Sequence, residues 1–372
     1  MTSFSFTRTI RSLLAAGAAA GMLAGCSTLS YYTQAAQGQF ALLSDARPID
    51  DWLADPATNP KLRHRLEVAR QIRVYAVKEM ALPDNKSYKN YAALHRPFVL
   101  WNVVATPELS LKPLEWCFPI AGCVNYRGYY DKDAAEDYAR QLRAQGDDVE
   151  VGGVPAYSTL GWFSDPLVST FINYPDGELA RLIFHELAHQ IVYVPGDSQF
   201  NESFASTVEQ AGVERWLTDF GNPDMRAAYD KYSERKKDFL ALLLKYRKEL
   251  DQTYKSAIPD EAKRQAKAAL FARLKDDYQG LKVSWGGYAG YDRFFASPLS
   301  NAHLASIATY NDFVPAFRAL LERERGFPAF YREVKRIAAL DRGERHRVLK
   351  KLAAGAELPT LPALQRTIDA SR

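Results

Sequence analysis

The sequence predicts an α+β fold that is rich in helices, and three observations predict it. Between residues 96 and 174, short runs of aromatic and β-branched residues alternate with proline and glycine, as in a small sheet. Residues 176–217 then place apolar side chains at helical spacing. From residue 224 to residue 280 the chain is dense in charge and again helical in period, and a break at Pro259 indicates a helical hairpin.

The composition is that of a globular protein with one core. The chain has 372 residues, of which 47% are hydrophobic and 25% charged, and it contains no internal repeat or low-complexity linker. We therefore expect residues 26–372 to form a single unit that ends in a helical region at 281–355. The net charge of +4, from 48 basic and 44 acidic residues, is too small for a nucleic-acid-binding surface. No nucleic-acid partner is expected.

The first 25 residues are predicted to be an export signal. Arg8 and Arg11 precede the apolar run "SLLAAGAAAGMLAGC", which is too short to span a membrane comfortably. Its end, "LAGC", resembles the lipobox of bacterial lipoproteins, which implies cleavage before Cys26 and a lipid anchor on that residue. Ser27 resembles the residues that allow lipoproteins to reach the outer membrane, with the protein facing the periplasm. An ordinary signal peptide cut near Ala24 is the alternative.

Two further cysteines lie six positions apart in "WCFPIAGCVNYRGYY". Export favours a disulfide between Cys117 and Cys123, because Pro119 and Gly122 let the loop between them fold back. Two buried free thiols remain the alternative. A metal site at these cysteines is disfavoured, since no histidine or third cysteine is nearby.

The segment "DGELARLIFHELAHQIVYV" is predicted to be a helix with two different sides. At 100° per residue its apolar side chains gather on one side, with Glu178, His185 and His189 nearly opposite. Histidines of a core would lie on the apolar side, so this pair predicts two metal ligands one turn apart. Glu186 flanks the pair and is placed to take a proton from a metal-bound water. Asp176 is expected to cap the helix. This is the H-E-x-x-H arrangement.

A third ligand is expected from a second helix, "QFNESFASTVEQAGVERW". Its apolar positions Phe204, Val208 and Ala211 share one side, which leaves Glu202 and Glu209 on the other. Glu202 follows His189 by thirteen residues, where an antiparallel helix would pass the metal. A catalytic zinc ion keeps three protein ligands and one water, so His185, His189 and Glu202 are the predicted ligands of one Zn²⁺ ion.

These residues resemble two known groups of proteins. "HELAH" followed by "NE" looks like the thermolysin-like metallopeptidases with a glutamate as third ligand, the gluzincins. Over most of the mature chain, the lipobox, "CFPIAGC", "YRGYY", "HELAHQ", "NESFA" and "TYNDFVPAF" resemble, in this order, the bacterial lipoprotein family described as putative aminopeptidases. The resemblance implies a tyrosine that stabilises the oxyanion, with Tyr310 as the candidate and Tyr288, Tyr291 and His303 as rivals.

Substrate binding is predicted at two places. The segment "VPAYSTLGWF", with Tyr157, is expected to be an edge strand that pairs with an extended peptide. An aminopeptidase also needs an acid for the free α-amine, and the nearest candidates are Asp165 and Glu209, the latter two helical turns after Glu202. The sequence leaves exopeptidase and endopeptidase activity open.

Three functions follow from these observations. The favoured one is a zinc metallopeptidase, an aminopeptidase by resemblance, anchored to the bacterial envelope and acting on peptides. The second is an envelope assembly or quality-control factor whose peptidase site is rarely used. The third is a structural lipoprotein with an accidental motif and no bound metal.

Overall fold

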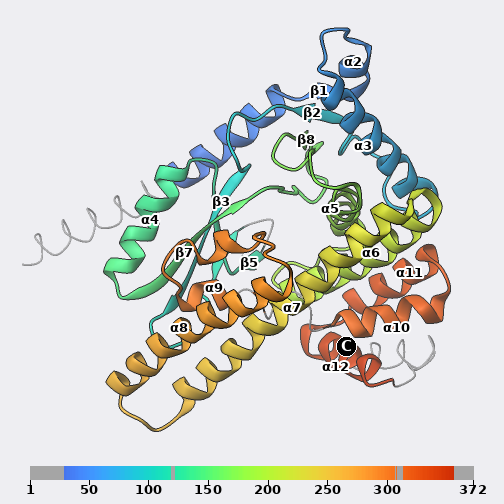
Figure 1. Ribbon diagram of the computed structural model, residues 1–372. Coiled ribbons are helices and arrows are strands. Elements are labelled where there is room, and N and C mark those ends of the chain that lie inside the picture. The colour runs from blue at the N-terminus through green and yellow to red at the C-terminus, as the bar shows by residue number, and fades with distance from the viewer. Residues whose placement is uncertain (1–28, 119–121, 306, 308–312, 356–372) are drawn as a thin grey trace, which may run out of the picture.

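The computed structural model describes residues 29–118, 122–305, 307 and 313–355, and it confirms the helix-rich α+β fold (Figure 1). The export signal, Cys26 and Tyr310 lie outside the described residues. Within the described part of the chain, no helix is long and apolar enough to cross a membrane.

The N-terminal part is mostly helical. Residues 29–44 form a first helix, and after β1 (Arg47–Pro48) come α2 (Ile49–Ala54) and α3 (Pro60–Lys78). α3 begins where Asn59 accepts a hydrogen bond from the backbone of Lys61 and a proline occupies the first helical position. α3 packs against the central helix α5 (Asp176–His189).

The strands form three small sheets instead of the single sheet expected over residues 96–174. Their orders are β1-β2-β8, β6-β3-β7 and β4-β5. The strands are β2 (Asn90–Ala92), β3 (Leu100–Pro107), β4 (Trp116–Phe118), β5 (Gly122–Val124), β6 (Arg127–Tyr129), β7 (Asp147–Val154) and β8 (Leu167–Val168). The expectation was wrong because β8 pairs in parallel with β2, and β2 pairs with β1 near the N-terminus, which separates them from the β3 sheet. α4 (Lys132–Ala144) packs on β3 and β7.

The segment predicted to be the last strand is mainly a loop. β7 ends at Val154, and residues 155–166 contain no strand. Leu160 and Gly161 have φ values of 58° and 84°, a left-handed turn that a strand cannot contain. Tyr157 therefore lies on a loop and not in a sheet edge.

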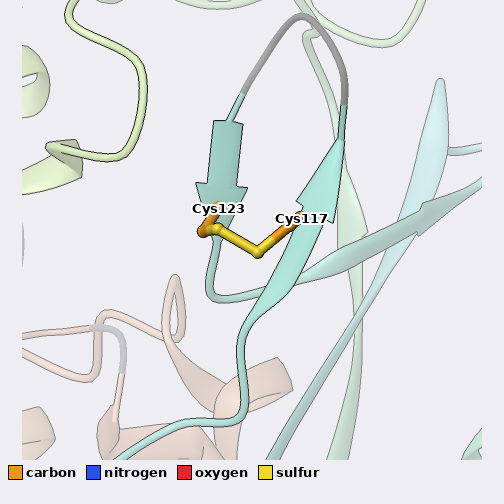
Figure 2. The surroundings of a disulfide bond; sticks show 2 residues. All are labelled: Cys117 and Cys123. Carbon is orange, nitrogen blue, oxygen red and sulfur yellow. A yellow bond between two sulfur atoms is a disulfide. The ribbon is translucent and has the colours of Figure 1, made fainter.

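The hairpin of β4 and β5 contains a disulfide between Cys117 and Cys123 (Figure 2). Their Cα atoms lie directly opposite each other, 3.9 Å apart. Gly122 has a φ of 72°, and a Cβ atom there would lie 2.8 Å from the backbone nitrogen of Gly196. The hairpin thus packs closely on the turn that precedes α6 (Ser198–Phe220).

α5 and α6 form the centre of the molecule and pack against each other along their length. α5 is covered almost all round, since Leu182, Phe184 and Ala188 are buried together with the predicted apolar side. Asp176 does not cap this helix but pairs with Arg65 of α3, because the chain enters α5 through Pro175. α6 is buried on both sides, between α5 and α10 (Val314–Glu324).

The remaining helices form two groups. α7 (Pro223–Lys255) and α8 (Asp260–Ser284) make an antiparallel hairpin with its own apolar cluster, which also contains residues of the 3₁₀ helix η1 (Asp292–Phe295) and of α9 (Asn301–Ala305). α10, α11 (Phe327–Ala338) and α12 (Arg342–Ala353) pack together beside α6 (Figure 1).

Candidate metal centre

α5 and α6 bring three potential metal ligands together. His185 and His189 lie one turn apart at the end of α5, and Glu202 lies in the second turn of α6. Between the helices, Asn201 holds the turn closed: its side chain accepts a hydrogen bond from the backbone of Val194 at 2.8 Å and donates one to it at 2.9 Å. This clamp fixes where Glu202 leaves α6.

The ligand atoms of these three residues lie within 4.8 Å of one another. The two Nε2 atoms of His185 and His189 are 3.1 Å apart. One carboxylate oxygen of Glu202 is 3.4 Å from the Nε2 atom of His185, and the other is 3.7 Å from that of His189. Zinc–ligand bonds of about 2.0–2.2 Å at tetrahedral angles place neighbouring ligand atoms about 3.3–3.6 Å apart. The donor set therefore fits zinc in chemistry, and the three spacings lie within about 0.2 Å of this range.

The surroundings shift the pKa values of the two imidazoles in opposite directions. Burial lowers the pKa of His189 to about 4, so its ring is neutral and can act as a ligand. Burial would also lower the pKa of His185, but hydrogen bonds with Glu202 and Glu209 outweigh it and raise that pKa to about 10. A metal ion would replace this proton between the two carboxylates.

Glu209 contacts the side of His185 that faces away from the other ligands, and its surroundings differ from those predicted for an amine-binding residue. Its side chain is 2% exposed, and its Oε2 atom is 2.8 Å from the Nδ1 atom of His185 and 2.9 Å from the guanidinium of Arg181. The Nζ atom of Lys236 is 3.7 Å from its Oε1 atom. Because α5 and α7 cover this side of α6, Glu209 is neither solvated nor accessible to a peptide amine. It instead orients His185, so that Nε2 faces the ligand site.

Glu186 lies on α5 between the two histidines. Burial is the main cause that raises the pKa of its carboxyl group to about 7; His185 lowers this pKa, and Glu202 and Asp165 contribute smaller increases. A carboxylate with a pKa near neutrality suits proton transfer at physiological pH. Within the described residues, Glu186 forms no hydrogen bond or ion pair, so it is not committed to a structural partner.

Two tyrosines flank this group. The ring of Tyr193 lies edge-on to His189, with centroids 6.4 Å apart. Burial raises the pKa of Tyr193, and the charge of Glu202 adds a smaller increase. Burial raises the pKa of Tyr157, and Asp165, Tyr193 and Glu186 add to this. Tyr157 is 40% exposed, which leaves it open to a ligand. The sequence reasoning missed Tyr193, although its position four residues after His189 was a usable signal.

The other candidates for oxyanion stabilisation lie elsewhere. The ring of Tyr291 stacks on Phe239 of the helical hairpin, with centroids 4.0 Å apart, and Arg235 lies over the ring of Tyr288. His303 is buried and pairs with Glu150 of β7. Tyr310 lies outside the described residues.

Asp165 is a structural residue of the loop that carries Tyr157. It is 3% exposed and accepts hydrogen bonds from the backbone nitrogen of Thr159 at 2.9 Å and from the hydroxyl of that residue at 2.8 Å. Burial raises the pKa of Asp165 to about 6. The prediction that it binds a substrate amine does not fit these contacts, because its oxygens face the loop.

The start of α6 is held by a buried ion pair from the far end of the chain. Asp197 caps α6, and its carboxylate lies 2.8 Å from the Nε atom of Arg345 and 2.9 Å from the Nε2 atom of His346, both in α12. Glu202 is one turn further along α6. Nothing in the sequence pattern indicated this contact, because the residues are 148 positions apart.

Comparison with protein families identifies a family for most of the chain. A model of the family described as "Putative aminopeptidase" matches residues 30–349. The chain belongs to this family, and family membership indicates peptidase activity. Comparisons with curated proteins and with solved structures give no match.

Proposed function

We propose that the protein is a zinc-dependent metallopeptidase of the gluzincin type, with aminopeptidase activity. The observation that supports it most is the convergence of the donor atoms of His185, His189 and Glu202 within 4.8 Å of one another. Glu186, which has no hydrogen-bond or ion-pair partner within the described residues, lies beside them on α5. Family membership supports peptide substrates and is the only support for the aminopeptidase specificity.

The residues of the chain have distinct roles in this proposal. Bound by His185, His189 and Glu202, zinc would polarise the peptide carbonyl and lower the pKa of a water molecule. Glu186 accepts a proton from the attacking water and passes it to the leaving amine, because it lies between the two histidines on α5 and forms no hydrogen bond or ion pair within the described residues.

Two further parts of the site support the same chemistry. Glu209 accepts a hydrogen bond from Nδ1–H of His185, which keeps the lone pair of Nε2 free. The hydroxyl groups of Tyr193 and Tyr157 are candidate donors for the developing oxyanion within the described residues, and Tyr310 is the candidate from the sequence.

The proposal includes anchoring by a lipid on Cys26 at the periplasmic side of the outer membrane. The lipobox "LAGC" after an arginine-containing apolar run supports it, and Ser27 supports the outer membrane. Mass spectrometry of the N-terminal peptide from the native host tests this part. An unmodified Cys26, or cleavage at Ala24, would contradict it.

Metal content and activity test the central claim. The purified protein is expected to contain one zinc ion per chain and to hydrolyse unblocked peptides until a chelator removes the metal. His189→Ala should lose both, whereas His64→Ala, at an exposed position of α3, should lose neither. Equal zinc content in the two variants would refute the site. Equal cleavage of N-acetylated and free peptides would refute only the aminopeptidase specificity.

A further inference from the structure

The helix at residues 29–44 has an outer face without charge. Its sequence, "LSYYTQAAQGQFALLS", contains no Lys, Arg, Asp or Glu. A helix at a protein surface ordinarily carries charged residues on its solvent side. Here the exposed positions are uncharged throughout: Leu29, Ser30, Tyr32, Thr33, Ala36, Gln37, Phe40, Ala41 and Ser44. The α7–α8 hairpin, which is rich in exposed charge, shows that the chain does use charge on its solvated helices.

Apolar side chains form a stripe along this outer face. Leu29, Tyr32, Ala36 and Phe40 recur at spacings of three and four residues, which places them on one side of the helix. The exposed fractions of Leu29, Tyr32 and Phe40 are 69%, 42% and 70%. Large apolar side chains left this open in a row indicate a contact surface.

The opposite face fixes the helix to the body of the protein. The guanidinium of Arg127 lies 4.1 Å from the ring centroid of Tyr31, and Gln34 accepts a hydrogen bond from the backbone of Tyr130 at 3.0 Å. Gln39 accepts one from the hydroxyl of Tyr130. The helix is therefore held in place, with the apolar stripe pointing away from the body, and it forms a border of the molecule in Figure 1.

The short distance in sequence between Cys26 and the helix indicates what covers the apolar stripe. Only residues 27 and 28 separate Cys26 from Leu29, so their Cα atoms are at most about 11 Å apart. A lipid on Cys26 would hold the start of the helix at the surface of a bilayer. This step rests on the acylation proposed above. The helix of 16 residues would extend about 24 Å from that point.

We propose that the outer face of this helix lies on the lipid bilayer, with Leu29, Tyr32 and Phe40 inserted at the boundary of headgroups and acyl chains. Helices that lie in this boundary bury an apolar face there. Because the face is uncharged, binding depends on apolar insertion and requires no anionic lipid. Tyr130, which forms hydrogen bonds with Gln34 and Gln39 of this helix, also has its ring 6.4 Å from that of Tyr157, which links the helix to the loop of Tyr157.

Vesicle binding without the lipid anchor tests the face itself. The mature chain with Cys26→Ser is expected to sediment with neutral phosphatidylcholine–phosphatidylethanolamine vesicles. Adding Phe40→Glu should lower its partition coefficient about tenfold or more, because a carboxylate replaces an inserted ring. Val283→Glu, at a 77% exposed position of α8, is the matched control and should leave binding unchanged. Equal binding of all three proteins, or no binding by any, would overturn the proposal.

A second measurement places the helix in the acylated protein. Phe40→Trp should be quenched by brominated acyl chains in the vesicles, and Val283→Trp should not. Absence of quenching at position 40 would overturn the proposal even if Cys26 is acylated. If Phe40→Glu instead dissociates a dimer in analytical ultracentrifugation, the face is covered by a second copy and the membrane assignment is wrong. Zinc content and hydrolysis should be unaffected by these variants, so failure here is distinguishable from failure of the proposed function.

Discussion

The helix pair α5–α6 and the hairpin α7–α8 both carry many charged residues, but they place them in opposite surroundings. In the hairpin, Lys245 and Asp277 pair across the two helices with side chains 51% and 44% exposed. In the central pair, Glu209 is 2% exposed and lies between Arg181, His185 and Lys236. A charge on the polar side of a helix is thus solvated only where no other element covers that side. Four substitutions test this contrast.

The largest effect is expected at Glu186. Glu186→Gln should retain metal and fold but lose about 10²–10⁴ in kcat, because the amide cannot accept the proton of the attacking water. Steady-state hydrolysis together with zinc analysis measures this. Equal kcat values for the variant and the parent would refute the role of Glu186 as general base.

Asp197→Asn should lower the free energy of unfolding by about 3–5 kcal/mol, since it leaves the charge of Arg345 buried without its partner. Urea denaturation measures this change. A loss below 1 kcal/mol, the usual range for an exposed pair, would show that this ion pair behaves like a surface one.

The same ion pair predicts a pH dependence. Burial would raise the pKa of Asp197, but hydrogen bonds from His346 and Arg345 outweigh it and lower that pKa below its ordinary value. Its contribution to stability is therefore fully present above about pH 4 and is lost as the pH falls through the lowered pKa. The difference in stability between parent and Asp197→Asn should shrink in this acidic range. A difference that does not change with pH there would contradict the assignment.

Glu209→Gln is expected to weaken zinc binding about 10–100-fold, because it removes the carboxylate that orients His185. Competition with a metal-binding indicator measures the affinity. Glu214→Gln, on an exposed part of the same helix, is the matched control and should bind zinc like the parent. If Glu209→Gln changes only the KM for peptides with a free amine, Glu209 is an amine anchor after all.

The smallest effect is expected in the hairpin. Lys245→Met should change the free energy of unfolding by less than about 1 kcal/mol, because both partners of its ion pair are half-exposed. Urea denaturation in low and high salt measures it. A loss comparable to that of Asp197→Asn would remove the contrast between the two regions.

The comparison also explains which parts of the site could be read from the sequence. His185, His189 and Glu202 were recognisable because their spacing within and between two consecutive helices is local information. The burial of Glu209 could not be recognised from the sequence, because it depends on α7, the helix of Lys236. Helical periodicity predicts that α7 is a helix but does not show where it packs. The same holds for Asp197, whose partners are 148 and 149 residues away.

The fold shows a similar division. The helical segments followed from periodicity and from breaks such as Pro259, and the fold class is confirmed. The sheets did not follow, because β8 pairs with residues of β2 that lie 76 positions earlier, an arrangement that local propensity does not encode. The loop around Tyr157 was mistaken for a strand because its aromatic residues suit one, whereas the left-handed turn at Leu160 and Gly161 ends it.

The ion pair of Asp197 with α12 connects the proposed metal site to residues near the C-terminus. All three proposed ligands lie before residue 203, yet the start of the helix that carries Glu202 is held by residues 345 and 346. A chain truncated before α12 would contain every ligand and still lack the ion pair that holds α6. We therefore expect fragments that end before α12 to hold the start of α6, and with it Glu202, less firmly than the full chain does.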